Sequence, residues 1–347
     1  MRTYLAGDEI NIFYDLHASQ FMTESSMSYL YSYYTLKTMI PIERVERKMP
    51  DMQPKIFLDS GAFSAKSKNI KIDVHEYIDF VKEHKANINV YANLDVIGKG
   101  KATWKNQRIM EFAGLSPLPV FHIEEDMSIL YHCIENYEYF CLGGMAGEPA
   151  RSRVIFFDRC FKIICDTPDK TPKCKVHGFG MTDVRLLLRY PWYSVDSTAW
   201  ITTSRTGGVI IPQRKNGQWR YDVPPYKIFV SGRSPVLYDR RKHLMSMPPA
   251  MQKSVLSYIE EKGYILGESR YETRSPKSKL NDGERWVDKV AGEVEIIVHP
   301  GITNKHQYRD ELNAIYFLDL EKMAKPWPWS WHTNQTSSSG PVVGFGL

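Results

Sequence analysis

Short apolar runs alternate with amphipathic stretches along the middle of the chain, from residue 55 to about residue 200. The runs are rich in β-branched and aromatic residues, and the stretches between them place apolar residues at helical spacing. A repeat of about 20 to 30 residues with this alternation is typical of consecutive βα units whose strands are parallel. The pattern predicts strands at residues 55–59, 88–95, 118–123, 139–144, 174–180 and 192–196.

Two further apolar runs raise the number of expected strands from six to eight, the number in a complete barrel. RTYLAG at 2–7 is the candidate first strand, and GVIIP at 208–212 is the candidate last strand. After the first strand, TESSMSYLYSYYTLKTM at 23–39 is interpreted as a helix that opens on a Thr or Ser cap. Parallel strands separated by helices in this number favour a (β/α)8 TIM barrel, although the pattern alone also accommodates a doubly wound open sheet.

The alternation stops after about residue 225. Beyond this point the sequence predicts a helix, a polar basic loop, a strand and a second helix, at residues 249–262, 267–285, 293–299 and 307–324. We therefore expect a catalytic α/β barrel over residues 1–225, which later segments can complete. Residues 226–347 are expected to form a C-terminal α/β appendage with nucleic-acid-binding elements and a flexible tail. A chain of 347 residues is long enough for this arrangement or for two ordinary domains.

The chain carries 45 Lys and Arg against 40 Asp and Glu, which gives a net charge of +5 and a pI near 8.7. This excess is compatible with a polyanionic partner, because phosphate contacts dominate the affinity of proteins for nucleic acids. Many basic enzymes never touch nucleic acid, so the charge alone does not identify the partner.

Membrane insertion, secretion and disulfide bonding are not expected. No stretch approaches the roughly eighteen uncharged apolar residues of a membrane helix, and the first residues, MRTYLAGDEINIF, carry acids where a signal peptide has its apolar segment. The five cysteines form no CxxC pair and are odd in number, which is typical of reduced thiols. We expect a soluble cytoplasmic protein with neither disulfides nor a cysteine zinc site.

Polar residues and glycines stand where the predicted parallel strands end, which is the face at which a barrel builds its active site. Asp59 and Asp196 each follow an apolar strand. Breaking a glycosidic bond needs such a pair, one carboxylate to attack the anomeric carbon and one to manage the proton of the leaving group. The structural alternative is that each aspartate caps the next helix or turn. The glycines form neither a P-loop nor a dinucleotide fingerprint, so no nucleotide cofactor is expected.

Five short motifs occur in a fixed order: DSGAF at 59–63, YANLD ending at 95, LGGMAGE at 142–148, HGFGM at 177–181 and YSVDS at 193–197. In that order they resemble the tRNA-guanine transglycosylase superfamily, whose barrel carries DSGGF, a base-binding aspartate, GGLAVGE, a GVG turn and a nucleophilic aspartate. The resemblance covers about residues 55 to 200, a little under half of the chain. The order and spacing of the motifs carry more weight than any one of them.

The resemblance implies that Asp59 is the general acid/base and that Asp196 is the covalent nucleophile. It also implies a base-binding set in which Asp95 accepts from the base edge, two glycines present backbone groups to the heterocycle, and the HGFGM segment lines its face. At the position where the family often has a glutamine, this chain has His122 or Glu124 to read the base. The other members of the base-binding set are Gly143, Gly144, His177, Gly178 and Met181.

One feature of the family is missing from this chain. The tRNA enzymes carry a zinc site of three closely spaced cysteines and a histidine in the C-terminal region, whereas the last cysteine here is Cys174. The chain is therefore more similar to the shorter, phage-borne DpdA-type branch, which exchanges guanine in DNA for a 7-deazaguanine such as preQ0. This similarity implies DNA and a free 7-deazaguanine base as partners, the cytoplasm of the host cell as the location, and no metal or other cofactor.

Three alternatives to a DNA transglycosylase stay open at this point. The first is a zinc-free enzyme that performs the same exchange on tRNA. The second is a non-catalytic barrel subunit that binds nucleic acid, and the third is an unrelated barrel glycosidase that uses the same two aspartates and releases its product without exchange.

Basic residues in and after the segments TSRTGG and PQRKNGQWR are the candidates for phosphate contacts near the mouth of the barrel. The alternative for each of them is an ordinary solvated surface. The candidate nucleic-acid-binding set is Arg205, Arg214, Lys215, Arg233, Arg240 and Arg241.

Overall fold

The computed structural model of the chain describes residues 1–7, 28–36, 54–145, 147–234, 239 and 242–333. Contacts divide the chain into two compact units. The described residues within Met1–Asn11, Met22–Thr198 and Leu320–Leu347 belong to unit 1, and those within Ala199–Asp319 belong to unit 2. The first long run of unit 1 thus ends earlier than the boundary at residue 225 that the sequence pattern suggests, and the chain returns to unit 1 near its C-terminal end.

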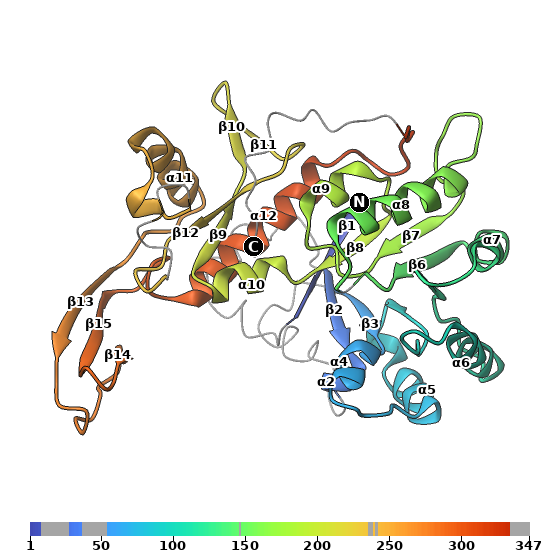
Figure 1. Cartoon of the computed structure of the whole chain (residues 1–347), viewed down its shortest axis with the longest axis horizontal. Coiled ribbons are helices and arrows are strands. Elements are labelled where there is room, and N and C mark those ends of the chain that lie inside the picture. Colours follow the sequence, from blue (N-terminus) through green and yellow to red (C-terminus); the bar gives the residue numbers. More distant parts are fainter. Residues whose placement is uncertain (8–27, 37–53, 146, 235–238, 240–241, 334–347) are drawn as a thin grey trace. The chain divides into compact units, whose positions relative to one another are not determined.

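Unit 1 is built on a curled sheet of eight parallel strands (Figure 1). The spatial order is β4-β3-β2-β1-β8-β7-β6-β5, so neighbours in sequence are neighbours in space around the curl. The strands are β1 (Arg2–Ala6), β2 (Ser28–Ser32), β3 (Lys55–Asp59), β4 (Val90–Tyr91), β5 (Val120–His122), β6 (Tyr139–Gly143), β7 (Lys175–Gly178) and β8 (Ser194–Ser197).

Strands β4 and β5 are the two ends of the hydrogen-bonded order. Between these ends lies an isolated parallel bridge that joins Ala92 to Leu118. There the Leu118 N–H donates to the Tyr91 carbonyl and the Asn93 N–H donates to the Leu118 carbonyl, both at 2.9 Å. The expected mixed α/β architecture with eight parallel strands is confirmed, but the ladder between β4 and β5 is not continuous and the sheet is not closed as a barrel.

Two sequence-based assignments that concern the expected barrel are wrong. Residues 28–32, expected within a helix, form β2, and only Tyr33–Leu36 is helical there, as α2. The tyrosines favour an extended strand because their rings pack on the pleated surface, where Tyr29 and Tyr31 stack at 5.7 Å between ring centroids. The expected last barrel strand is β9 (Gly208–Ile211), which lies in unit 2 and pairs antiparallel with β12 (Tyr226–Phe229). A short apolar run does not reveal which sheet it joins.

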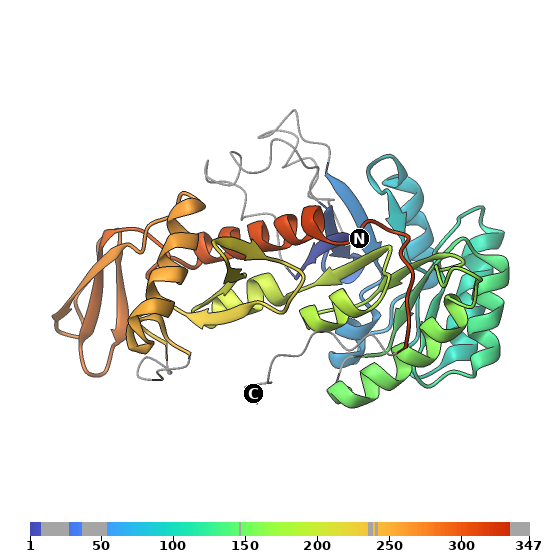
Figure 2. The same ribbon diagram turned by 90° about the horizontal axis from the view of Figure 1, so that it is seen from above.

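Helices connect the parallel strands and lie around the outside of the sheet (Figures 1 and 2). Aspartates begin several of them: Asp73 accepts from the backbone N–H groups of His75 and Glu76, and Asp126 and Asp183 cap the later helices in the same way. The helices are α4 (Ala62–Ser67), α5 (Val74–Glu83), α6 (Gly100–Phe112), α7 (Met127–Asn136), α8 (Ala150–Ile164) and α9 (Val184–Arg189), with a 3-10 turn, η2 (Lys85–Asn87), after α5.

The inner face of the sheet is apolar near its middle and polar at its carboxyl end. Tyr4, Phe57, Val120 and Cys141 form one buried cluster contributed by four strands. All five cysteines are buried thiols. The fold therefore supplies a rigid platform below the strand ends that carry the candidate site.

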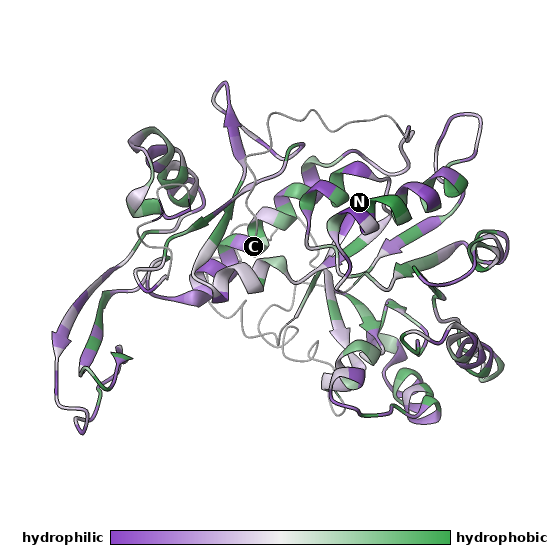
Figure 3. Ribbon diagram, viewed as in Figure 1, coloured by the Kyte–Doolittle hydropathy of each residue, from purple (hydrophilic) through white to green (hydrophobic). Residues whose placement is uncertain are grey.

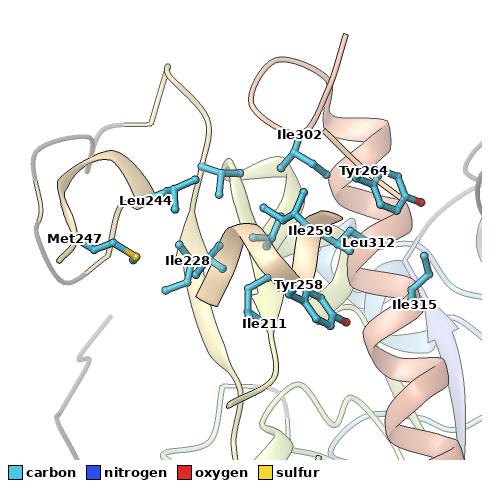
Figure 4. Packing of buried hydrophobic residues seen from close by; sticks show 13 residues of the cluster. Ile211, Ile228, Leu244, Met247, Tyr258, Ile259, Tyr264, Ile302, Leu312 and Ile315 are labelled. Atoms are coloured by element: carbon cyan, nitrogen blue, oxygen red, sulfur yellow. The ribbon is translucent and has the colours of Figure 1, made fainter. Parts of the chain in front are cut away.

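Unit 2 has its own apolar core, shown in Figure 4. Ile211, Ile228, Tyr258, Leu312 and Ile315 contribute to it from two strands and two long helices. Its further elements are α10 (Ala199–Arg205), β10 (Gln213–Lys215), β11 (Gln218–Arg220), η3 (Leu244–Ser246), α11 (Pro249–Glu261), β13 (Glu268–Thr273), β14 (Glu284–Asp288), β15 (Glu293–His299) and α12 (His306–Met323). Residues of α12 through Asp319 belong to this unit. Among the described helices of the chain, none combines the length and the apolar composition needed to cross a bilayer.

The basic segment 267–285, expected as a loop, contributes two strands to a three-stranded antiparallel sheet of order β13-β15-β14. Its charged side chains, which make β13 mostly hydrophilic in Figure 3, hide the strand pattern. Arg274 donates to Glu284 at 2.7 Å and to Glu272 at 3.0 Å, and Arg285 donates to Glu295 at 2.7 Å. The arginines of the segment therefore pair with acids of the segment itself and of β15.

Candidate active site

The parallel sheet of unit 1 brings the site residues that the sequence predicts at strand ends to one edge. Asp59 ends β3, His122 ends β5 and Asp196 lies in β8, while Asp95 follows β4 and Gly143 ends β6. Because carboxyl ends of parallel strands share one edge of a sheet, these groups face a common region. Asp95 and Asp196 lie close enough to Asp59 for their charges to affect its pKa.

Asp59 is a half-buried carboxyl group at the end of β3. Its Oδ2 accepts a hydrogen bond from the backbone N–H of Gly61 at 2.9 Å. Burial is the main cause of a raised pKa, the nearby Asp95 charge adds to it and Asp196 contributes less, so that the pKa of Asp59 rises to about 7. A carboxyl group with this pKa can donate and accept a proton near neutral pH.

Gly61 is required by the turn that holds Asp59. Its φ is 76°, and a Cβ there would lie 2.1 Å from the Ser32 Oγ. A Cβ would also lie 2.5 Å from the Cβ of Tyr34 in α2, so a larger residue would have to displace that helix, and the positive φ favours glycine as well.

Asp95 is held between a serine and a histidine. Its Oδ1 accepts a hydrogen bond from the buried Ser60 Oγ at 2.9 Å, and its Oδ2 lies 3.2 Å from the Nε2 of His122. On the other side of the ring, the Oε2 of Glu125 lies 3.7 Å from Nδ1. Burial opposes the charged form of His122, but the hydrogen bonds to Asp95 and Glu125 raise its pKa to about 9. His122 is therefore an imidazolium at neutral pH, packed against Asp95.

Glu125, which the sequence analysis does not single out, is the glutamate that contacts His122. Its Oε2 accepts the backbone N–H of His122 at 2.8 Å, whereas Glu124 is exposed. The spacing of three residues after a strand end, within reach of that strand's last N–H, is the signal that points to Glu125. His122 and both glutamates line a cavity of about 70 Å³ together with Gly98, Lys99 and Gly100.

Gly143 and Gly144 make room for the His122 ring. A Cβ on Gly143 would lie 2.9 Å from the Val120 Cγ1 and 3.5 Å from the His122 Cδ2. Gly144 has a φ of 81°, and a Cβ there would lie 3.3 Å from the His122 Cβ. These contacts give the two glycines a packing role next to the role at the heterocycle that the resemblance implies.

Asp196 is buried, and one of its two oxygens is held by the protein. The Oδ1 accepts the Gly180 N–H at 2.9 Å and lies 3.3 Å from the Nε2 of His177. Its own backbone carbonyl accepts the Met181 N–H at 2.8 Å. Within the described part of the chain, Oδ2 has no hydrogen-bond partner. One oxygen is thus fixed and the other is available to a ligand.

The HGFGM segment positions Asp196 as well as offering a surface to a ligand. His177 is fully buried, and Gly178 and Met181 are buried too, with a Cβ on Gly178 only 3.0 Å from the Met181 Cγ. Phe179 is the ring of this segment that is partly exposed, and it lies 4.7 Å from the His177 ring. The segment that the sequence assigns to the face of a base therefore offers Phe179, while His177 faces Asp196.

The described basic candidates lie in unit 2, whereas the carboxylates lie in unit 1. Arg214 lies over the Trp219 ring at 4.9 Å and 3.7 Å from Glu261, while Lys215 and Arg233 are exposed. Arg205 ends α10. Arg240 and Arg241 lie outside the described residues.

No family model matches the chain, and no curated protein matches its sequence. The resemblance to transglycosylases stays a prediction from the order of the five motifs in the sequence.

Proposed function

We propose that the chain is a base-exchanging glycosyltransferase that replaces guanine in DNA by a 7-deazaguanine such as preQ0 or a relative. The observation that carries the proposal is the contrast between two carboxyl groups at one edge of the sheet. Asp59 has a pKa raised to about 7, whereas Asp196 has one oxygen held by two donors and the other free within the described structure. A proton carrier and a fixed nucleophile are what glycosyl transfer requires.

In the first half-reaction, Oδ2 of Asp196 attacks C1′ of a deoxyguanosine flipped out of its stack. The C1′–O bond forms as the C1′–N9 bond breaks, and guanine leaves with the electron pair on its ring. Protonated Asp59 donates its proton to the departing base, which avoids a free purine anion. The product is a glycosyl ester on Asp196 with an abasic position in the strand.

In the second half-reaction, a 7-deazaguanine enters the vacated position and its N9 attacks C1′. The C1′–O bond breaks, Asp196 recovers its carboxylate, and the N9 proton passes to Asp59, which is then ready for the next cycle. Every proton and electron pair is accounted for by the two aspartates, so the exchange needs no further reactant.

Asp95 is the group that we assign to the base edge. Each carboxylate oxygen can accept two hydrogen bonds, and Asp95 uses one acceptor position of each oxygen for Ser60 and His122. The remaining positions suit the N1–H and 2-amino donors of a guanine-type edge. Phe179 offers a partly exposed ring to the face of the base.

We further infer that the curled sheet is a (β/α)8 barrel. The strand order runs without interruption around the curl, and the Ala92–Leu118 bridge lies between its two end strands. The choice of DNA over tRNA rests on the chain having no cysteine after Cys174, because the tRNA enzymes use a zinc site in that region.

Nucleoside mass spectrometry tests the reaction and the polymer together. The full chain is incubated with preQ0 and either duplex DNA, single-stranded DNA or tRNA, and the digested nucleosides are analysed. We expect the modified deoxynucleoside with wild-type protein and with Asp79→Ala, an exposed control on α5, and none with Asp196→Ala. Modification of tRNA but not of DNA would show that tRNA is the substrate. Release of guanine without incorporation of preQ0 would indicate a hydrolase. Full activity of Asp196→Ala would refute the assignment of the nucleophile.

A further inference from the structure

A buried chain of hydrogen bonds runs behind Asp196 across three neighbouring strands. The Nε2 of His177 lies 3.3 Å from the Asp196 Oδ1, and the His177 Nδ1 lies 2.6 Å from the Ser194 Oγ. The Ser194 Oγ in turn lies 2.5 Å from the Tyr139 hydroxyl. His177 and Ser194 are register partners in β7 and β8, and both are completely buried. The chain of contacts is therefore built into the pairing of the strands.

The direction of donation along this chain follows from its two ends. A carboxylate only accepts, so the Nε2 of His177 donates to Asp196 and its Nδ1 accepts from the Ser194 hydroxyl. The Ser194 oxygen then accepts from Tyr139, whose pKa burial raises far above its usual range, so it remains a phenol. Burial also lowers the pKa of His177 against the opposing effect of Asp196. The ring is neutral, and its tautomer is set by Asp196, which requires the proton on Nε2, while the Ser194 hydroxyl satisfies Nδ1.

The surroundings of His177 exclude water. Its ring lies 4.4 Å from the Phe57 ring and 4.7 Å from the Phe179 ring, both edge-on, with Tyr4 at 6.0 Å. Hydrogen bonds in such an apolar setting are stronger than in water and hold a single geometry.

We propose that His177 is a positioning residue that accelerates the departure of Asp196 from the glycosyl ester, and this inference rests on the proposed function. In the free carboxylate, Oδ1 carries part of a full negative charge. In the ester, Oδ1 is a neutral carbonyl oxygen. A donor to Oδ1 therefore binds the carboxylate more strongly than the ester, because hydrogen bonds to charged groups are the stronger ones.

The consequence differs for the two half-reactions. The His177 donor stabilises the state from which Asp196 attacks, so it does not help the attack. The same donor stabilises the Asp196 carboxylate that forms as the C1′–O bond breaks, so it accelerates the second half-reaction. Removing the donor should slow the decay of the covalent adduct by about tenfold, since the difference between a charged and a neutral hydrogen bond is of that order. A residue that merely supported the fold would slow both steps.

Two substitutions of His177 separate donation from packing. His177→Leu fills the apolar cage and removes the donor, whereas His177→Gln can place an amide N–H near the Nε2 position and should restore much of the decay rate. Ser194→Ala removes the donor to Nδ1 and should act in the same direction as His177→Leu, more weakly. The exposed His75 at the start of α5 provides the matched control, His75→Gln.

The experiment measures adduct formation and adduct decay separately. A guanine-containing oligonucleotide is mixed with excess full-length protein, and the covalent protein–DNA adduct is followed by denaturing gel electrophoresis. Excess free guanine is then added as the incoming base, and loss of the adduct is timed. We expect His177→Leu to form the adduct at a rate close to that of wild type, to lose it about tenfold more slowly, and to accumulate it at steady state.

The outcomes separate this inference from the proposed function. If wild-type protein forms an adduct and His177→Leu loses it at the wild-type rate, or forms and loses it equally slowly, the role of His177 is refuted while the transglycosylase proposal stands. If wild-type protein forms no adduct with any of the nucleic acids, the proposed function fails and this inference fails with it. If His177→Leu does not fold, the rates of adduct formation and adduct loss are measured for Ser194→Ala and His177→Gln instead, and they test the role of His177 in the same way.

Discussion

Replacing Asp59 by Asn should stabilise the protein at alkaline pH while it removes the proton carrier. Asn has the shape of a protonated Asp and keeps an oxygen for the Gly61 N–H, which lies 2.9 Å from the Asp59 Oδ2. The charge that burial and Asp95 disfavour is lost. The substitution thus removes a cost that the fold bears for the chemistry.

The sign and size of the stability change follow from the raised pKa of Asp59. Asp59 holds its proton up to about pH 7 in the folded chain, whereas the ordinary pKa of an aspartate, 3.8, applies in the unfolded chain. The unfolded state therefore loses its proton first as pH rises, and native stability falls between these two values and stays reduced above them. The full difference corresponds to at most about 4 kcal/mol above pH 7, and to less than about 2 kcal/mol at pH 5. Partial exposure of Asp59 to solvent reduces both figures.

Thermal melting of the full chain at about pH 5 and about pH 8.5 measures the effect. One kcal/mol shifts the melting temperature of a unit of this size by roughly 2–4 °C, so Asp59→Asn should exceed wild type by several degrees more at the higher pH. The control is Asp79→Asn, an exposed carboxylate on α5. An advantage of Asp59→Asn that is the same at both pH values would show that the carboxyl has an ordinary pKa, and would remove the case for its role in proton transfer.

Two further substitutions test the packing and the charges beside the site. Gly178→Ala brings a Cβ to 3.0 Å from both the Met181 Cγ and the Trp192 ring, so urea titration should show a loss of about 1–3 kcal/mol in the free energy of unfolding, and an unchanged midpoint would contradict this packing. Glu125→Gln removes one of the two charges that raise the pKa of His122 to about 9, so the midpoint of its imidazole titration by NMR should fall, and an unmoved midpoint would assign the raised pKa to Asp95 alone.

The strands whose apolar runs are bounded by polar residues could be located from sequence. β3 begins and ends where the pattern places it, at 55–59, because three buried residues stand between Lys55 and Asp59. β2 was missed because Tyr and Leu at 29–31 satisfy a helical and an extended pattern equally, and the choice is made by neighbouring strands on both sides. The sheet that receives β9 is likewise decided by long-range pairing with β12.

Some residues of the candidate site could likewise be predicted from the sequence, and others could not. Asp59, Asp95 and Asp196 could be placed together because parallel strands deliver their last residues to one edge. The groups that hold these carboxylates and shift their pKa values could not be identified from the sequence. Ser194 reaches His177 only through the register of β7 and β8, and sequence does not state a register.

The two aspartates alone do not distinguish exchange from hydrolysis, since a retaining glycosidase uses the same pair. What differs is the acceptor that meets the glycosyl ester, water in one case and a purine nitrogen in the other. A site for exchange must therefore hold a base after guanine has left, with a group that remains an acceptor throughout. Ser60 and His122 hold the Asp95 carboxylate from within the protein, with its Oδ1 2.9 Å from the Ser60 Oγ and its Oδ2 3.2 Å from the His122 Nε2, so its position does not depend on a bound base. In the transglycosylase that we propose, the preference for a base over water thus resides in Asp95 and His122, and the proton carrier and nucleophile supply the bond chemistry common to both reactions.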